Sequence, residues 1–206
     1  GAFPDTVEFG GSTLNAKNYD PEGAKAVLEE AGWTDSDGDG IREKDGQKLT
    51  VRWLTYPSRQ ELPLLAESAQ STLKDIGMDV QINATADHNT IVKDTSAWDV
   101  YVGANVNCGL GDPTNFFSTH CLDASIKNRG QYHSDKMEEL AVQLNSTFDK
   151  TERNQIAIEM QQQLLDDNAF VFCSFLKMSM ISQANVTGLT AHASDYYELT
   201  ADLDIN

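Results

Sequence analysis

The stretch LTVRWLTYPSRQELPLLAESAQSTLKDIGMDVQI, residues 49–82, carries the alternation of strand and helix patterns that decides the fold. Its first part, 49–56, alternates apolar with polar side chains, which predicts a strand. Apolar residues then recur at helical spacing over 59–77, and the final glycine supplies a stop signal. The alternation returns at 80–82. This segment therefore predicts a strand-helix-strand unit.

The same pattern continues towards the C-terminus. We expect a helical stretch near 90–95 and a third strand marked by Trp98, Val100 and Val102. Both crossovers are long enough for right-handed βαβ units, which join parallel strands. The expected fold class is α/β, with a mostly parallel sheet flanked by helices.

Another helix is expected before the first strand. Asp20 is its expected N-cap and Pro21 its first residue, because this order satisfies free N–H groups and presets the helical φ angle. Gly32 is expected to end the helix, with Trp33 closing the cap. Its apolar face consists of Ala24, Val27, Leu28 and Ala31.

The second half of the chain predicts more helices. Ser134 is the expected cap of one helix and Thr151 of another. The stretch 169–181 is strongly apolar with poor alternation, and we interpret it as one or two buried strands.

The charge of the chain restricts its partners. Its 206 residues include 32 acidic and 15 basic side chains, for a net charge of −17, and the sequence pI is about 4.4. Such a surface repels phosphate backbones and anionic lipids. We therefore expect no nucleic-acid partner.

An acidic loop over 35–46 is the sharpest local motif. Asp35, Asp37 and Asp39 occupy the first, third and fifth positions of a calcium loop, but Gly46 stands where the bidentate glutamate belongs. Asp-Gly pairs are also typical of tight turns. A weak calcium site and a solvated structural turn both stay open.

Position indicates a second candidate site. Ligands of doubly wound sheets bind outside the carboxyl ends of the strands, and the small, polar loop 104–111 follows the third strand. Asp112 is alternatively the N-cap of a helical turn opening at Pro113, and the loop an ordinary surface loop. Because no nucleophile motif or phosphate-binding glycine motif occurs, we expect a protein that is not an enzyme.

The histidines and cysteines show no metal-ligand spacing. His120 alone is a candidate, since it lies just beyond the polar loop; His88, His133 and His192 are interpreted as surface or packed residues. One disulfide plus a free thiol and three free thiols are both compatible with Cys108, Cys121 and Cys173.

Several segments also match a known family in the right order along the chain. They are 19–33 (YDPEGAKAVLEEAGW), 35–46 (DSDGDGIREKDG), 73–80 (LKDIGMDV), Trp98-Asp99-Val100 with Gly111-Asp112-Pro113 and Phe116-Phe117, and Asn185–Leu189. Together they resemble the C-terminal lobe of family 5 extracellular solute-binding proteins, the dipeptide, oligopeptide and nickel receptors of ABC importers.

This resemblance implies two α/β lobes that close on a ligand about a hinge. Residues 1–190 are then the C-terminal lobe of a periplasmic-binding-protein-like fold, and 191–206 a C-terminal tail that packs on the missing N-terminal lobe. The implied function is the substrate-binding component of an ABC importer, which captures a small solute and delivers it to the ABC permease subunits. The implied location is outside the cytoplasm, periplasmic or lipid-anchored on the outer face of the membrane.

The resemblance also implies site residues. Peptide-binding members have an Asp where this chain has Gly109, whereas nickel-binding members hold a chelate with aromatic residues and a histidine, near the region of His120. Peptide and nickel-chelate ligands both stay open, and a disulfide between Cys108 and Cys121 is implied. The residues expected to line the cleft are Asn105, Asn107, Gly109, Asp112 and His120. The alternative function is a calcium-stabilised extracellular interaction module that uses its acidic surface to meet a basic partner.

Overall fold

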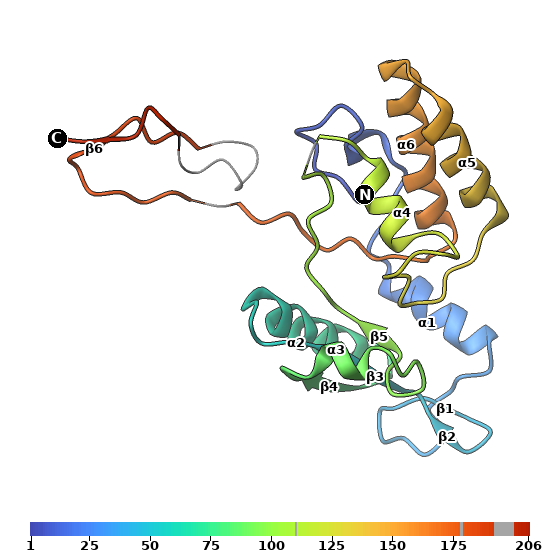
Figure 1. Cartoon of the computed structure of the whole chain (residues 1–206). Coiled ribbons are helices and arrows are strands. Elements are labelled where there is room, and N and C mark those ends of the chain that lie inside the picture. Colours follow the sequence, from blue (N-terminus) through green and yellow to red (C-terminus); the bar gives the residue numbers. More distant parts are fainter. Residues whose placement is uncertain (110, 178, 192–199) are drawn as a thin grey trace.

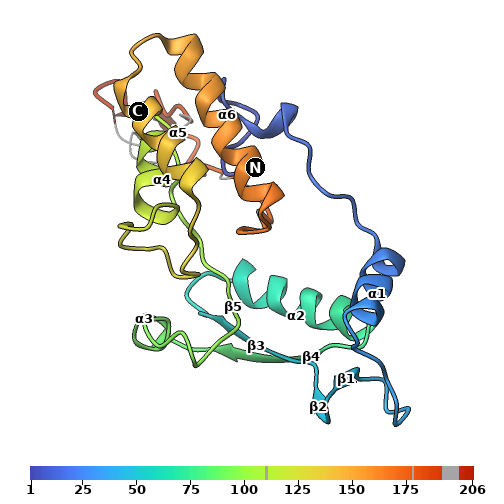
Figure 2. The same ribbon diagram turned by 90° about the vertical axis from the view of Figure 1, so that its right-hand side faces the viewer.

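The computed structural model describes residues 1–109, 111–177, 179–191 and 200–206, and it divides into an α/β unit and a helical unit (Figure 1). The α/β unit comprises residues 20–103. The helical unit comprises residues 1–14 together with 112–170. Figure 2 shows the segment 14–20 running from the helical unit to α1.

A three-stranded parallel sheet forms the centre of the α/β unit, as predicted. The strands are β3 (Thr50–Thr55), β4 (Asp79–Ala84) and β5 (Val100–Tyr101), in the order β4-β3-β5. The third strand is shorter than the expected 98–102, because only Val100 and Tyr101 pair with β3.

Helices cover this sheet on both faces. Helix α2 (Glu61–Lys74) contacts β4 and β3. On the other face, Leu54 of β3 is buried with Val92 and Trp98. The helix between β4 and β5 is α3 (His88–Ile91), so the expectation of a helix over 90–95 was wrong in its bounds.

Helix α1 (Pro21–Glu30) has the predicted caps. The Asp20 side chain accepts a hydrogen bond from the Gly23 N–H at 2.8 Å. Gly32 adopts φ 86°, and the Trp33 N–H donates to the Leu28 carbonyl in a Schellman cap. The predicted apolar face is nevertheless not buried, since Val27 is 65% exposed.

Arg42 ties the ends of α1 and α2 together. The residue is 9% exposed, and its Nε donates to the Ile76 carbonyl at 2.9 Å. Its Nη1 donates to the Trp33 carbonyl at 2.9 Å, and its Nη2 pairs with Glu29 at 3.0 Å. One guanidinium thus satisfies a carbonyl group in each of the turns that follow the two helices.

The acidic loop leads into a hairpin of β1 (Glu43–Lys44) and β2 (Gln47–Lys48). Asp45 and Gly46 form its two-residue turn with φ 52° and 76°. Both values are positive, as in the Asp-Gly turns that suit the twist of a hairpin. The position that a calcium loop gives to glutamate is therefore a turn glycine.

The helical unit consists of α4 (Thr114–His120), α5 (Asp135–Ser146) and α6 (Lys150–Asp166), with the N-terminal segment and its 3₁₀ turn (Gly11–Thr13) packed on them. Ser134 caps α5 as predicted. The predicted Thr151 cap was wrong, because Asp149 accepts from the Glu152 N–H at 2.9 Å and the helix begins two residues earlier. The largest buried core side chains are Phe3, Phe117, Met137, Leu140, Leu144, Met160 and Leu164.

The C-terminal part departs from the prediction. The described residues of 169–181 form no strand, and Val171 and Ile181 are 87% and 94% exposed. Their composition is typical of a buried strand, but no strand of the described chain pairs with them. Further on, β6 (Val186–Thr187) pairs with β7 (Asp204–Ile205), and this hairpin extends away from both units (Figure 1). Residues 192–199 of the predicted tail, including His192, lie outside the described residues.

Candidate ligand-binding site

The strand order creates a switch point at the carboxyl edge of the sheet. The chain passes from the central strand β3 to β4 on one side, and then crosses to β5 on the other. Loops after β3 and β5 therefore diverge, and the point where they separate is the usual place for a ligand in such sheets. The predicted loop after the third strand begins at this edge.

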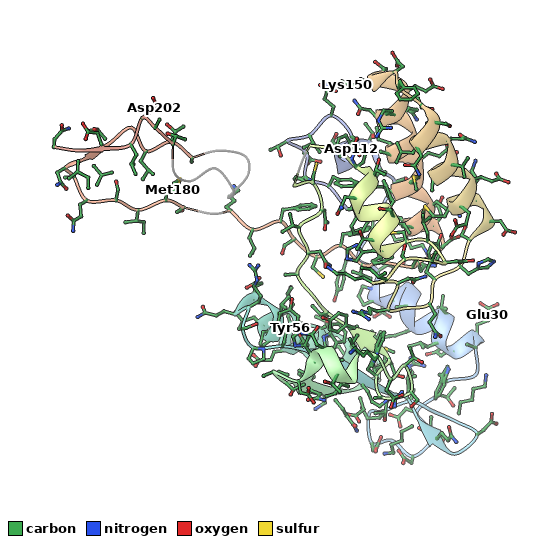
Figure 3. The ribbon with its side chains drawn as sticks, in the orientation of Figure 1. Glu30, Tyr56, Asp112, Lys150, Met180 and Asp202 are labelled. Carbon is green, nitrogen blue, oxygen red and sulfur yellow. The ribbon has the colours of Figure 1, made fainter. Side chains whose placement is uncertain are left out.

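Aromatic side chains flank the switch point. Tyr56, labelled in Figure 3, directly follows β3 and stacks on His88 with ring centroids 4.0 Å apart. The ring centroid of Tyr101 in β5 lies 6.3 Å from that of His88. Burial raises the pKa of Tyr101. Tyr56 was not among the predicted site residues, although a tyrosine directly after a strand was an available signal. His88 was interpreted as a surface or packed residue, and it packs on Tyr56.

Tyr56 also holds the start of the polar loop. Its hydroxyl oxygen accepts a hydrogen bond from the backbone N–H of Ala104 at 3.0 Å. This bond joins the end of β3 to the chain that leaves β5. The loop therefore starts from a fixed point at the edge of the sheet.

Asn105 and His120 meet across the site. The Asn105 side-chain oxygen lies 3.2 Å from Nε2 of His120, and Nδ1 of His120 lies 3.2 Å from the Phe116 carbonyl oxygen. His120 is 7% exposed and stacks on the Phe116 ring at 5.1 Å. Burial lowers the pKa of His120; the Phe116 carbonyl opposes this, and the nearby charges of Lys127 and Arg129 add to it.

Asn107 and Gly109 lie deeper in the loop. The Asn107 amide nitrogen donates to the Ala2 carbonyl at 2.6 Å, which ties the loop to the N-terminal segment. Its amide oxygen is buried and has no partner among the described residues. Gly109 is half-buried and offers only backbone groups.

Asp112 is bound within the protein. Its Oδ2 accepts from Arg153 of α6 at 2.6 Å, and its Oδ1 accepts from the Thr114 N–H at 2.8 Å, next to the start of α4. Burial works to raise the pKa of Asp112, but the Thr114 and Arg153 hydrogen bonds outweigh it and the pKa is lowered. The predicted alternative, Asp112 as N-cap, was wrong by one residue, because α4 begins at Thr114 and Pro113 is its N-cap.

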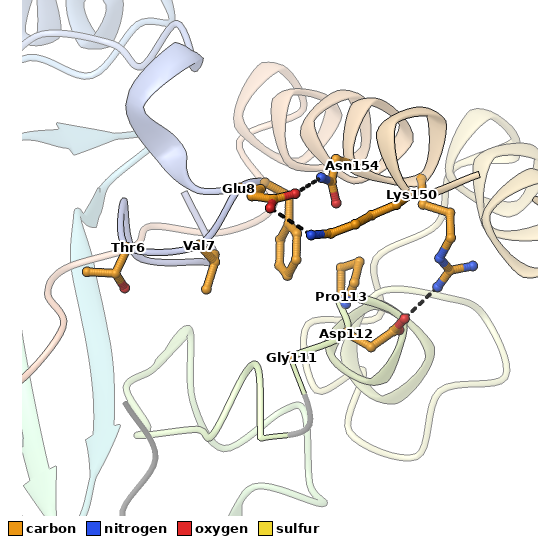
Figure 4. A pocket seen from close by; sticks show the side chains of 10 residues that line it. Thr6, Val7, Glu8, Gly111, Asp112, Pro113, Lys150 and Asn154 are labelled. Carbon is orange, nitrogen blue, oxygen red and sulfur yellow. Dashed lines mark hydrogen bonds and ion pairs between the residues drawn. The ribbon is translucent and has the colours of Figure 1, made fainter. Parts of the chain in front are cut away.

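An open cavity of about 310 Å³ lies beside Asp112, between the N-terminal segment and α6 (Figure 4). Glu8 in this cavity pairs with Lys150 at 2.7 Å and with Asn154 at 2.8 Å. Arg153 is engaged by Asp112. Because these polar groups are already satisfied and the cavity does not contain Asn105, Asn107 or His120, we do not take it as the ligand site.

The structure thus brings together only part of the predicted set. Asn105 and His120 are in contact, and Asn107 belongs to the same loop. Asp112 points to α6 instead.

The acidic loop brings Asp35, Asp37 and Asp39 together, with carboxylate oxygens within 4.8 Å of one another. Asp35 accepts from the N–H groups of Gly38 and Gly40 at 2.7 and 3.0 Å. Lys48 pairs with Asp39, and its ammonium lies 3.9 Å from Asp37. A lysine therefore already supplies positive charge to the cluster.

The three cysteines are free thiols in the structure, so it does not contain the implied disulfide between Cys108 and Cys121. Cys121 is 1% exposed, and Cys108 packs against the same core. Burial raises the pKa of both thiols.

A parallel sheet with a polar loop and aromatic side chains at its switch point defines the class of α/β ligand-binding domains. The family model "Bacterial extracellular solute-binding proteins, family 5 Middle" matches residues 1–128, more than half of the chain. The chain therefore belongs to family 5 of the bacterial extracellular solute-binding proteins. Proteins of this family are transport binding proteins and not enzymes, in agreement with the prediction.

Curated relatives include nickel and peptide binders. The chain is 29% identical to the nickel-binding protein NikA of Staphylococcus aureus over 136 residues, covering 66% of this chain and 26% of that protein. It is 25% identical to the nickel-binding periplasmic protein of Escherichia coli, over 88% of this chain and 35% of that protein. It is 24% identical to the oligopeptide-binding protein AppA of Bacillus subtilis, over 88% of this chain and 34% of that protein. The chain thus spans only about a third of the length of these relatives.

Solved structures confirm the fold class. A nickel ABC transporter protein of Bacillus halodurans superposes with a TM-score of 0.71 at 26% identity, covering 81% of this chain and 34% of that one. AppA of Bacillus subtilis in complex with a nonapeptide gives 0.67 at 21% identity, covering 82% and 35%. Among the described residues, no helix has the length and apolar character needed to cross a membrane.

Proposed function

We propose that this chain is the C-terminal lobe of a receptor that captures a small solute and delivers it to the permease of an ABC importer. The observation that carries the proposal is the polar loop at the switch point of a family 5 fold, anchored by Tyr56 and holding Asn105 against His120. Ligand capture then follows closure of a second lobe over this edge. The proposed location is outside the cytoplasm, either in a periplasm or on a lipid anchor.

The charges around His120 support a ligand that bears a carboxylate. Lys127 and Arg129 act on His120 electrostatically in a chain whose net charge is −17. Local positive charge in a negative protein favours anionic groups at that place. Peptides and histidine chelates of nickel both carry carboxylates, so we propose these two ligand classes and keep both.

A second lobe also explains the exposed apolar segment. The described residues of 169–181 expose Val171, Phe175, Leu176 and Ile181. Large exposed apolar surface is typical of an interaction site. Since the chain spans about a third of its relatives, we propose that this segment and the tail 191–206 pack on the N-terminal lobe.

The experiment is a thermal-shift screen of the full two-lobe receptor with a tripeptide, free nickel, and nickel with L-histidine. A raised melting temperature with one of these probes identifies the ligand class, because a ligand that binds only the folded state stabilises it. The 206-residue chain alone should bind weakly, since half of the cleft is absent. No shift with any probe would contradict both proposed ligand classes.

The second candidate function is a calcium-stabilised extracellular interaction module. The close approach of three carboxylates in the acidic loop favours it, while Lys48 competes for the same oxygens. Calcium should raise the melting temperature of the wild type but not of a variant with Asp35→Asn and Asp39→Asn. No shift at millimolar calcium would exclude a metal role for this loop.

A further inference from the structure

His120 raises a question of hydrogen-bond chemistry. Each of its ring nitrogens lies 3.2 Å from an oxygen, Nδ1 from the Phe116 carbonyl and Nε2 from the Asn105 amide oxygen. A neutral imidazole carries one N–H and one acceptor nitrogen. Two oxygen partners therefore require either a doubly protonated ring or a different orientation of one partner.

Only one of these partners can change its role. The Phe116 carbonyl is a backbone acceptor inside α4, so Nδ1 must carry the proton that it receives. The Asn105 amide, by contrast, can turn by half a rotation and present its NH₂ group, because its oxygen and nitrogen occupy similar space.

The surroundings disfavour the doubly protonated ring. His120 is only 7% exposed, and burial penalises a charged imidazole. Lys127 and Arg129 add repulsion to a positive charge there. A neutral ring with the proton on Nδ1 leaves Nε2 as an acceptor, which the Asn105 NH₂ group then satisfies.

We infer that His120 is a positioning residue that holds the Asn105 amide with its nitrogen inward and its oxygen outward. Asn105 is exposed, so an oxygen turned away from His120 is free to accept a hydrogen bond from a ligand. The inference rests on the proposed function and deepens it, because an outward acceptor selects a ligand with an N–H donor, such as an amino group. His120 itself, with both nitrogens engaged, orients Asn105 and does not contact the ligand.

The direct test is the tautomer of His120, measured near neutral pH by long-range ¹H–¹⁵N correlation spectra of the 206-residue chain. The expected result is a protonated Nδ1 and an unprotonated Nε2. A protonated Nε2, alone or together with Nδ1, would overturn the inference. This measurement needs no ligand, so its outcome is separate from that of the thermal-shift screen.

Asn105→Asp provides the matched perturbation. A carboxylate offers no N–H to Nε2, so the His120 ring is expected to gain a proton at Nε2, and its ¹⁵N resonance moves to the protonated range. Asn115→Asp, the same change at an exposed position of α4, should leave His120 unchanged. If Asn105→Asp also leaves the His120 resonances in place, Asn105 is not the partner and the inference fails.

A binding experiment on the full receptor reports the consequence for the ligand. With whichever probe stabilises the wild type, Asn105→Leu is expected to weaken binding at least tenfold and Asn115→Leu to leave it unchanged. His120→Phe keeps the ring stack on Phe116 but removes both hydrogen bonds, so it should also weaken binding. The melting temperature of the free protein should fall less in this variant than in a variant with a truncated core side chain. If both Asn105→Leu and His120→Phe bind the probe with wild-type affinity, His120 does not position Asn105 for the ligand. This result would leave the proposed receptor function intact, because binding of the probe by the wild type tests that function separately.

Discussion

The side chain of Gln161, fully buried in α6, accepts a hydrogen bond from the backbone N–H of Ala2 at 3.0 Å. The same oxygen accepts from the Phe3 N–H at 3.3 Å, and the amide nitrogen donates to the Phe9 carbonyl at 2.8 Å. The amide of Gln161 thus satisfies backbone groups of the N-terminal segment, which does not pair with a strand of the described chain.

Gln161→Met is therefore expected to lower the free energy of unfolding by about 3 kcal/mol, because it leaves several buried backbone groups without partners. Urea unfolding measures this change. Gln163→Met, on the same helix, removes only a local contact with Asp167 and should cost less than about 0.5 kcal/mol. Equal losses in the two variants would show that Gln161 contributes only its volume.

Arg42→Met tests the clamp between α1 and α2. Loss of the bonds to the Trp33 and Ile76 carbonyls should lower the free energy of unfolding by about 3 kcal/mol, since both acceptors stay partly buried. Arg59→Met, at an exposed position, is the control and should change stability by less than about 0.5 kcal/mol. A small effect of Arg42→Met would mean that water replaces the guanidinium.

The ion pair of Asp112 with Arg153 predicts a dependence of stability on pH. The folded-state pKa of Asp112 is lowered, so its contribution is present above the unfolded pKa of about 3.9 and is lost as pH falls through the lower folded value. Because the Asp112 side chain is 47% exposed, the contribution is about 1 kcal/mol or less. The stability difference between wild type and Asp112→Asn should therefore shrink between neutral pH and about pH 3. A difference that grows on acidification would contradict this sign.

Tyr56→Phe isolates the anchor of the polar loop. Removal of the hydroxyl leaves the Ala104 N–H without its acceptor, so amide exchange at Ala104 should accelerate at least tenfold, with about 1 kcal/mol lost in stability. Hydrogen-deuterium exchange resolved by NMR measures the first effect. Tyr19→Phe, at an 81% exposed position, should change neither quantity. Unchanged exchange at Ala104 in Tyr56→Phe would show that the loop has another anchor.

The sequence predicted those elements whose signals are local. The strands at 50–55 and 79–84 and the stop at Gly77 follow from period and backbone freedom alone. The cap of α6 was misplaced because Asp149 and Thr151 are both good caps, and only the geometry chooses between them. The prediction of buried strands over 169–181 failed for another reason. Apolar composition leads to burial only where a partner surface covers the segment.

The site depends on contacts that no local pattern contains. Tyr56 and His88 meet only because β3 and β4 are adjacent in the sheet, and the sequence does not state that order. The contact of Asn105 with His120 depends on how α4 folds back after the loop. Position at the carboxyl edge was predictable, whereas the partner of each side chain was not.

The helical unit is discontinuous along the chain, and this sets the order in which the two units should fold. Phe3 and Phe9 share a core with Met160 and Leu164, whereas the α/β unit of residues 20–103 is one continuous stretch. Contacts of such long sequence separation form late, since a long loop must close first. The α/β unit should therefore fold before the helical unit, whose N-terminal segment stays uncovered until α6 packs on it.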